Sequence, residues 1–533
     1  MTEPRQGFDR ILEFQTSGQD IPSLLAHWAH HRPEHPALIW DPGAESVRSW
    51  TYRELLADVH RLAAGLSARG IAPGDKVLIH SDNSPEMVLA WLACATLGAV
   101  AVTTNTKSVV SELAYFTAKA QCVAAITQPQ YAALVAKAAP TMKWIAVTDS
   151  DESGQPVAEG EGFERFGALF AEDPTQWVGR AVEPMLPFGI MFTSGTTNRP
   201  KAVVHTHANA IWASRNGPRN IDLGPDDRYL IYLPFFHLNA QSWSFFSVLG
   251  AGATAVLMPK WSTSRFWEVV TRHDVTHISL MPFAFGLLQS SDRPSNHRLR
   301  VGSFGFVSRD FDRMLGISVY AAFGMTETVT HAIVGKPNEQ LPDRSMGHVA
   351  PGYEIAVVDK ETGSLCTEGE PGELWLRGTR GIQLFLEYFD NPDANDAAFE
   401  DGWFKTGDMV RMGSGGNVFY EERDKDLLKV GGENVSAREV EAVIATVAGV
   451  AQAAVVGKEH DFLGQVVVAF VITTPEAPDA TTLEAEIVAR CEESLASFKV
   501  PRAVYVTDSF PLGTLDKLLK NKLREIADAQ PPV

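Results

Sequence analysis

The sequence has few cysteines, no excess of basic residues and no apolar run long enough for a membrane span. The net charge of −19 over 533 residues argues against a general nucleic-acid or anionic-membrane surface, although it leaves room for local basic pockets. The four cysteines stand far apart and show no metal-ligand spacing, so we expect them to pack in a core in a reducing compartment.

The longest apolar run, Met87 to Val102, falls short of the ~20 residues that a membrane span needs, and Gly98 interrupts it. The run predicts a buried helix followed by a strand. The segment from Met1 to Asp20 is polar and mixed in charge, which is not the pattern of a signal peptide. These features predict a cytoplasmic protein without integral membrane contact and without a nucleic-acid partner.

Length and composition predict a globular protein of two or three domains. A chain of 533 residues is too long for one hydrophobic core. Its hydrophobic content of 45% and charged content of 21% are those of a soluble globular protein.

Helix and strand signals alternate in the first part of the chain. Thr51 and Glu54 form a capping-box pattern, and Ser84-Pro85 marks the start of a further helix. Strands are expected at 77–80, 99–102, 123–126, 144–147, 229–233, 253–258 and 276–280. Alternation of this kind predicts parallel sheets with helices on both faces.

The pattern changes towards the C-terminal end. Segments 353–358 and 373–377 alternate around turn residues, which predicts antiparallel strands. After a charged run at 421–426, Ser436 and Glu439 form a second capping-box pattern. Further strands are expected at 453–456, 466–472 and 504–507, with helices around 483–495 and from 515. We therefore expect a domain at 1–423 and a smaller one at 424–533, which is long enough for a core of its own.

One polar segment after a predicted strand, 188–192, has the composition of a phosphate site. It reads Thr193-Ser194-Gly195-Thr196-Thr197-Asn198-Arg199-Pro200-Lys201. Small hydroxylated residues around a glycine let backbone N–H groups and hydroxyls converge on an anion, and the lysine adds positive charge. It is not a Walker loop, because Pro200 replaces the second glycine and Ala202 replaces the magnesium-binding hydroxyl residue. A polar turn between strands remains the alternative.

This segment resembles the phosphate loop of the adenylate-forming enzymes, the family of acyl-CoA synthetases, adenylation domains and luciferases. Further segments match in order from about Ile21 to Arg524. The resemblance implies an α/β fold with a large N-terminal domain of parallel, helix-layered sheets, a small β-barrel-like subdomain, and a small mobile C-terminal α+β domain. It also implies that ATP phosphates contact Thr193, Ser194, Gly195, Thr196, Thr197 and Lys201.

Phe323-Gly324-Met325-Thr326-Glu327 resembles the family's aromatic-Gly-x-Thr-Glu segment, with Phe where Tyr is usual. The residue types suit an aromatic plane for adenine, a hydroxyl for phosphate and a carboxylate for Mg²⁺. Taken alone, Glu327 would more often be an ordinary surface acid. By resemblance, Gly305 lines the adenine site, while Asp408 and Arg423 contact the ribose.

The C-terminal unit carries three more matching positions. Lys429-Val430-Gly431-Gly432-Glu433-Asn434 resembles the loop that approaches the thiol of CoA, so Lys429, Gly431 and Gly432 are predicted CoA contacts. A plain turn is the alternative for the glycine pair. Lys425 falls at the family's hinge position. Lys517 falls at the position of the catalytic lysine, although Asp516 precedes it where Gly is usual.

His237 lies in a Pro-x-Phe-His context that resembles the family histidine at the carboxylate end of the acyl pocket. A lone histidine is more often a structural residue. Amino-acid-activating relatives carry Asp here, so an amino acid is disfavoured. Asn239 and Gln241 are expected near the substrate, and they favour a short, aromatic or functionalised acid over a long plain chain.

The resemblance predicts an acid–thiol ligase that uses ATP, Mg²⁺ and CoA. A carboxylate would attack the α-phosphorus of ATP and release pyrophosphate, and the thiol of CoA would then displace AMP. In-line attack needs alignment and charge neutralisation, which we expect from Mg²⁺ on Glu327, from Thr326 and Lys517, and from the phosphate loop. The C-terminal domain is expected to swing about Lys425 between the steps, withdrawing Lys517 and presenting Gly431-Gly432.

Three alternatives stay open. The acyl group could pass to a carrier-protein thiol, or the chain could catalyse a luciferase-like oxidation. A nucleotide- or acyl-binding regulator without catalysis is prompted by Asn198, Ala202 and Asp516, which depart from the family pattern. The sequence does not determine which acid is used or whether the chain forms a homodimer.

Overall fold

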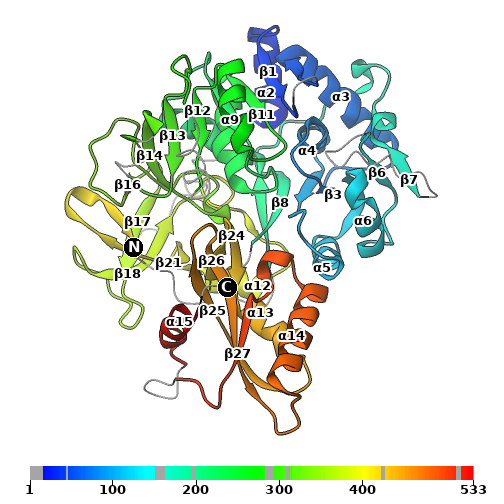
Figure 1. The fold of residues 1–533 in the computed structure, drawn as a ribbon. Coiled ribbons are helices and arrows are strands. Elements are labelled where there is room, and N and C mark those ends of the chain that lie inside the picture. The colour runs from blue at the N-terminus through cyan, green and yellow to red at the C-terminus, as the bar shows by residue number, and fades with distance from the viewer. Residues whose placement is uncertain are drawn as a thin grey trace, which may run out of the picture.

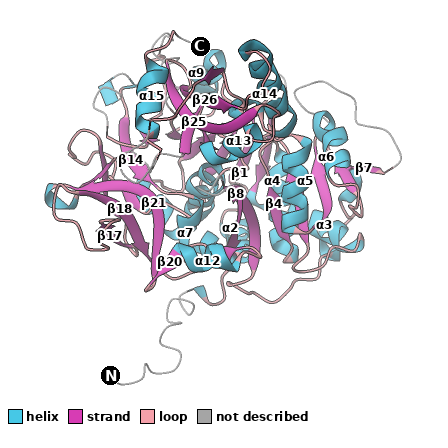
Figure 2. Cartoon of the chain, turned by 90° about the horizontal axis from the view of Figure 1, so that it is seen from below, coloured by secondary structure: helices cyan, strands magenta, loops and turns pink. Residues whose placement is uncertain are grey.

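The computed structural model describes residues 16–43, 46–149, 162–193, 200–281, 293–307, 312–313, 315–421, 427–511 and 518–531. Their strands form three sheets, of which two are large and one belongs to the C-terminal part of the chain. The C-terminal sheet packs beneath the two large sheets in the view of Figure 1. Figure 2 shows the same arrangement from below.

The first large sheet has eight strands in the order β19-β9-β8-β4-β3-β5-β6-β7. Its strands from β8 to β7 are parallel, and β9 and β19 add antiparallel at one edge. The strands are β3 Lys76–His80, β4 Val100–Thr103, β5 Cys122–Thr127, β6 Ile145–Val147, β7 Phe163–Arg165, β8 Pro187–Thr193, β9 Lys201–Thr206 and β19 Glu387–Tyr388. The helices of this region are α3 Tyr52–Ala68, α4 Pro85–Leu97, α5 Val110–Ala120 and α6 Ala132–Ala138.

The second large sheet has fourteen strands and joins a parallel part to an antiparallel part. The parallel strands are β1 Pro36–Trp40, β10 Arg228–Ile231, β11 Thr254–Leu257, β12 His277–Ser279, β13 Val301–Phe304 and β14 Ser318–Phe323. The antiparallel strands are β2 Arg48–Thr51, β15 Ile333–Val334, β16 Ser345–Val349, β17 Glu354–Val358, β18 Pro371–Arg377, β20 Phe399–Glu400, β21 Trp403–Met412 and β22 Val418–Tyr420. The small antiparallel region is thus continuous with the large sheet through β15 and β14.

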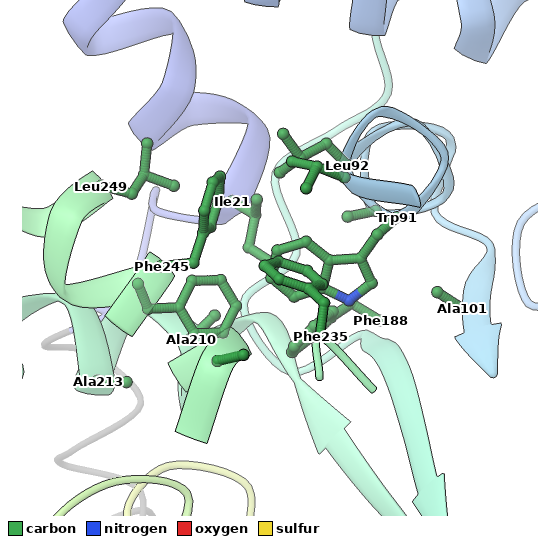
Figure 3. Packing of buried hydrophobic residues seen from close by; sticks show 14 of the residues in the cluster. Ile21, Trp91, Leu92, Ala101, Phe188, Ala210, Ala213, Phe235, Phe245 and Leu249 are labelled. Carbon is green, nitrogen blue, oxygen red and sulfur yellow. The ribbon is translucent and has the colours of Figure 1, made fainter. Parts of the chain in front are cut away.

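Helices and apolar side chains fill the space between the two large sheets. The helices of this part are α2 Ile21–His31, α7 His207–Ile221, the π-helix η5 Asn239–Phe246 and α8 Ser247–Ala251. The helix α9 Thr263–Arg272 packs on the opposite face of the second large sheet, and α12 Pro392–Ala398 lies against β19, β20 and β21. Trp91 of α4 lies 5.7 Å from Phe188 and 5.2 Å from Phe235 between ring centroids (Figure 3). The buried helix predicted from the apolar run at Met87 is therefore confirmed.

The C-terminal part builds its own sheet and core. Its strands are β23 Leu427–Val430, β24 Glu433–Ser436, β25 Val450–His460, β26 Gly464–Thr473 and β27 Ala503–Val506, and its helices are α13 Ala437–Ile444, α14 Ala480–Ser494 and α15 Lys520–Asp528. The apolar clusters on the two faces of this sheet contain only residues from 428 onwards. The predicted boundary between 423 and 424 lies outside the described residues and stays a prediction.

The two predicted capping boxes, at the starts of α3 and α13, differ in outcome. At α3 the capping box is confirmed, since Glu54 Oε2 accepts from the Thr51 N–H at 2.8 Å and Thr51 Oγ1 accepts from the Glu54 N–H. At α13 only one of the two hydrogen bonds of the predicted capping box forms, so the prediction is wrong for the other. Ser436 Oγ accepts from the Glu439 N–H, but the Glu439 carboxylate accepts from Lys499 Nζ at 3.0 Å. A buried ammonium attracts a carboxylate more strongly than a backbone N–H does.

Two further features bear on the predictions. The closing helix α15 begins at Lys520, later than the predicted start at Leu515, which lies outside the described residues. Across the described ranges, no helix combines the length and the apolar character that crossing a membrane requires.

Candidate active site

The predicted site residues follow neighbouring strands at one edge of the large mixed sheet. Strands β10, β12, β13 and β14 run parallel, so the segments after their carboxyl ends meet at the same edge. His237 follows β10, Gly305 follows β13, and the segment 324–327 follows β14. Met281, which was not predicted, follows β12. Gly305 is exposed, and a Cβ added there would meet no atom within 4 Å.

The predicted phosphate loop joins two antiparallel strands. The last residue pair of β8 and β9 is Thr193 with Lys201, so these two residues flank the loop directly. Ser194, Gly195, Thr196 and Thr197 lie outside the described residues. The strand expected before the loop is confirmed as β8.

Buried Glu327 and Tyr388 and half-buried Lys201 form a cluster next to this loop. Tyr388 Oη donates to Glu327 Oε1 at 2.9 Å, and Lys201 Nζ lies 4.4 Å from the centroid of the Tyr388 ring. Burial lowers the pKa of Lys201, and the charge of Glu327 opposes that shift. Burial and the neighbouring Glu327 carboxylate raise the pKa of Tyr388, which keeps its hydroxyl protonated as a donor.

The sequence reasoning missed Tyr388. It lies in β19, which pairs with β9 and thereby places its ring beside Lys201. The strand is only two residues long and lies far from the phosphate loop in sequence, so no periodic pattern marks it.

Close packing explains the glycine before Glu327. A Cβ on Gly324 would lie 2.6 Å from the carbonyl oxygen of Thr330 and 2.9 Å from the ring of Trp243. The next turn is held by His205, whose Nε2–H donates to the Thr326 carbonyl at 2.8 Å. Burial lowers the pKa of His205 to about 4, so the ring stays neutral and keeps this role near pH 7. Phe323 and Met325 flank Gly324 and are half-buried.

Asp408 lies in β21 and is buried. Its N–H donates to Thr406 Oγ1 at 3.1 Å, and its Oδ1 accepts from Tyr420 Oη at 3.5 Å. Tyr420 belongs to the neighbouring strand β22, so the antiparallel part of the sheet orients this carboxylate. Arg423 and Lys425 lie outside the described residues.

His237 contacts the C-terminal sheet. Its Nε2 lies 3.1 Å from Glu433 Oε2, and Lys107 Nζ lies 3.8 Å from Glu433 Oε1. Glu433 is 8% exposed. Burial alone would raise the pKa of Glu433, but His237 and Lys107 outweigh it and hold the pKa at about 2. Glu433 is therefore an anion that joins the C-terminal sheet to the predicted acyl-site histidine, a role that the sequence did not reveal.

Gly431 and Gly432 form the two-residue turn between β23 and β24. Val430 pairs with Glu433 across this turn, and the two glycines have φ of +58° and +88°. Such turns require positive φ at both positions, which glycine adopts without strain. A Cβ on Gly432 would lie 3.0 Å from Met281 Cε, so the turn rests against the N-terminal part of the chain. Lys429, in β23, lies 6.0 Å from the centroid of the Tyr420 ring.

A small cavity lies between β8, α7 and η5. Gln241 lines it and donates its amide N–H groups to Thr103 Oγ1 and to the Phe235 carbonyl. Asn239 Oδ1 accepts from Ser244 Oγ at 3.4 Å. The cavity is lined by Phe188, Met191, His205, Asn209, Ala210, Leu238, Gln241, Ser242, Phe246 and Val329. Its polar side chains already bond to protein, so the lining presents mainly apolar surface.

Lys517 lies outside the described residues. The chain on either side of it is held together, since the Leu519 N–H donates to the Pro511 carbonyl at 2.9 Å. Lys520 at the start of α15 pairs with Glu441 at 2.7 Å.

Two family models match the chain. The model of AMP-binding enzymes matches residues 25–389, and that of the C-terminal domain of AMP-binding enzymes matches 439–517. The crotonobetaine/carnitine–CoA ligase of Escherichia coli is 31% identical over 521 residues, which are 95% of this chain and 99% of the relative.

Solved structures agree with these matches. The o-succinylbenzoate CoA synthetase of Bacillus subtilis bound to a CoA product analogue has a TM-score of 0.79 at 28% identity, covering 95% of this chain and 98% of that one. The same enzyme in complex with AMP has a TM-score of 0.65 at 27% identity, covering 95% and 98%. The predicted fold class is thereby confirmed.

Proposed function

The chain belongs to the AMP-binding enzyme family and is an acyl-CoA ligase that works through an acyl-adenylate, and from this premise we propose how its residues share the two chemical steps. The main support for the proposal is a contact between the two parts of the chain: the Gly431-Gly432 turn and its neighbour Glu433 lie against Met281 and His237. This contact supports the proposal that the present arrangement of the two parts of the chain serves the thiol step.

In the first step, a carboxylate oxygen of the acid attacks the α-phosphorus of ATP, and pyrophosphate leaves. Lys201 and the hairpin loop beside it hold the phosphates, and Thr326 adds a hydroxyl. Tyr388 keeps Glu327 in place, because a buried carboxylate that accepts a hydrogen bond has a fixed orientation. Asp408 accepts from the ribose hydroxyls, and Lys517 neutralises charge that develops between the carboxylate and the α-phosphate.

Glu327 suits a magnesium ion that arrives with ATP. Within the described ranges, no group of three or more His, Cys, Asp or Glu side chains is arranged to hold a metal alone. Magnesium bound with nucleotides takes one or two protein carboxylates and completes its shell with phosphate oxygens and water. The single buried carboxylate of Glu327 fits that requirement. When bound, the ion neutralises phosphate charge.

In the second step, the thiol sulfur of CoA attacks the acyl carbon, the acyl–phosphate bond breaks, and AMP leaves. The glycine turn lets the backbone of the C-terminal sheet approach the acyl site without side chains in the way. Glu433 holds the turn there through His237 and Lys107. The better fit to the relative bound to a CoA product analogue than to its AMP complex supports this assignment.

We infer a compact acid over a long plain chain, because the cavity that Gln241 lines is small and mainly apolar. Apolar and aromatic side chains line it, and no unpaired charge faces it among the described lining residues. His237 precedes the lining residue Leu238 in the chain, and we assign it to orient the carboxylate. The Escherichia coli relative is named for crotonobetaine and carnitine, which places such betaines among the acids to test here.

A panel of acids tests this proposal. The purified chain would be given ATP, Mg²⁺ and each of a series of short linear, hydroxylated, aromatic and betaine acids, and pyrophosphate release would be measured with and without CoA. We expect release with compact acids and thioester formation with free CoA. Thioester only with a carrier protein, light or oxygen uptake, or no pyrophosphate with any acid would each favour one of the alternatives and contradict the proposal.

A further inference from the structure

A second contact joins the C-terminal part to the N-terminal part, away from His237. Lys499 Nζ donates to Glu112 Oε1 at 2.6 Å and to Glu439 Oε1 at 3.0 Å. Glu112 belongs to α5, whereas Lys499 and Glu439 belong to the C-terminal part. The three residues are 7%, 6% and 8% exposed, so this charged cluster lies almost entirely inside the interface. Figure 1 shows α14 directly below α5 in this region.

The carboxylate of Glu112 is held ready by its own helix. Glu112 is the third residue of α5, and its Oε2 accepts from the Val109 N–H at 3.1 Å. That bond caps the helix and points Oε1 towards Lys499. Beside it, Ser111 Oγ donates to the Ser494 carbonyl at 3.1 Å. The first turn of α5 is thus arranged to contact the C-terminal part of the chain.

The cluster contains one ammonium and two carboxylates, so its charges do not cancel. Lys499 and Glu439 already form a pair inside the C-terminal part, and Glu112 adds a second carboxylate. Burial lowers the pKa of Lys499, yet the two carboxylates outweigh it and raise that pKa, which keeps the ammonium charged. Burial raises the pKa of Glu439, as does repulsion from Glu112, while Lys499 opposes both. The added bond is therefore partly offset by repulsion and desolvation, as is common for buried ion pairs.

We propose that Glu112 is a positioning residue for thioester formation: it captures the Lys499–Glu439 pair and so sets the orientation in which the Gly431-Gly432 turn reaches the acyl site. This inference rests on the proposed function, and specifically on the division of the two steps between arrangements. A contact that must form and break in each turnover has to be specific in geometry but modest in net strength. A bond to a buried ammonium, opposed by a second carboxylate, meets both requirements.

The substitution Glu112→Gln isolates the cross-interface bond. The amide oxygen of the new side chain still caps Val109, while its NH₂ faces the ammonium of Lys499. We expect thioester formation from pre-formed acyl-adenylate and CoA to slow by about tenfold, the lower end of the range for a lost hydrogen bond to a charged group, because the repulsion between Glu112 and Glu439 is lost as well. Pyrophosphate release in the absence of CoA should stay within about twofold. Glu112→Ala should slow thioester formation similarly and also lower the thermal midpoint, since the cap is lost.

Glu54→Gln is the matched control. Glu54 has the same capping position at the start of α3, but it is exposed and bonds to Thr51 of its own helix start, far from the interface. Both half-reactions should be unchanged in this variant. Hydrogen exchange on the full chain adds a readout that does not need turnover. In Glu112→Gln, exchange should rise around 109–112 and 494–499, and not in the large sheets.

The outcomes separate this inference from the function on which it rests. If the unsubstituted chain releases no pyrophosphate with any acid, the proposed function fails, whatever the exchange data show. If it is active and Glu112→Gln slows both half-reactions equally, or slows neither, or leaves exchange at 494–499 unchanged, Glu112 does not position the C-terminal part.

Discussion

Replacing Glu433 with glutamine should separate the two half-reactions. Glu433 is buried, bonds to His237 at 3.1 Å and lies 3.8 Å from Lys107, and the two partners come from the N-terminal part. Glutamine keeps the shape and one acceptor oxygen but loses the charge. A hydrogen bond to a charged group contributes about 1.5–3 kcal/mol and a neutral one about 1 kcal/mol, so the docked arrangement should lose about 0.5–2 kcal/mol. That difference corresponds to about 2- to 30-fold in population.

The assay measures each half-reaction separately. Thioester formation from pre-formed acyl-adenylate and CoA should fall about 2- to 30-fold in Glu433→Gln, while pyrophosphate release without CoA should hardly change. His237→Ala should impair the use of the acid in both steps while ATP affinity stays near normal. The double variant tests the contact directly, because residues that touch couple by about 0.5–3 kcal/mol. Equal losses in both steps for Glu433→Gln, or strictly additive effects in the double variant, would refute the reasoning.

Three further predictions follow from the same account. Glu327→Gln should reduce adenylation by about 10²-fold with little change in thermal midpoint, since an amide still accepts from Tyr388; unchanged pyrophosphate release would remove Glu327 from the metal site. Lys517→Ala should lose about 10²- to 10³-fold in adenylation and spare thioester formation. Lys425→Pro should spare adenylation and slow thioester formation, because a fixed φ opposes rotation at that residue. Half-reaction rates showing equal losses in both steps would contradict the swinging domain. Burial lowers the pKa of His80 and of His331 to about 3, so unfolding takes up protons below pH 6.5. The free energy of unfolding should therefore fall by about 1.4 kcal/mol per pH unit for each ring as the pH drops towards 3. A thermal midpoint that holds steady from pH 7 to 5 would oppose this.

Local chemistry made much of the fold predictable. Thr51 and Glu54 begin α3 as their capping pattern predicts, and the apolar run at Met87 becomes the fully buried helix α4. The same holds for β8, which the apolar residues at 188–192 predict, whereas its antiparallel partner β9 was not predicted. Patterns within one turn or one strand are set by neighbouring residues, which the sequence displays directly.

The contacts that assemble the site were not predictable in this way. Tyr388 reaches Glu327 across 61 positions, Glu433 reaches His237 across 196, and Lys499 reaches Glu112 across 387. Each pair depends on how whole elements dock, and a single acid or tyrosine in the sequence carries no sign of its partner. The capping-box bond that Glu439 does not make has the same cause, because its carboxylate accepts from Lys499, which is distant in sequence, and not from the local N–H.

The most direct test of the central claim is the product balance of one reaction. The chain would be incubated with ATP, Mg²⁺, CoA and the best acid of the panel, and AMP, pyrophosphate and acyl-CoA would be quantified together. Ligation through an acyl-adenylate predicts equal amounts of all three, with AMP and pyrophosphate dependent on the acid. Formation of ADP and phosphate, or AMP and pyrophosphate without any acyl-CoA, would contradict it.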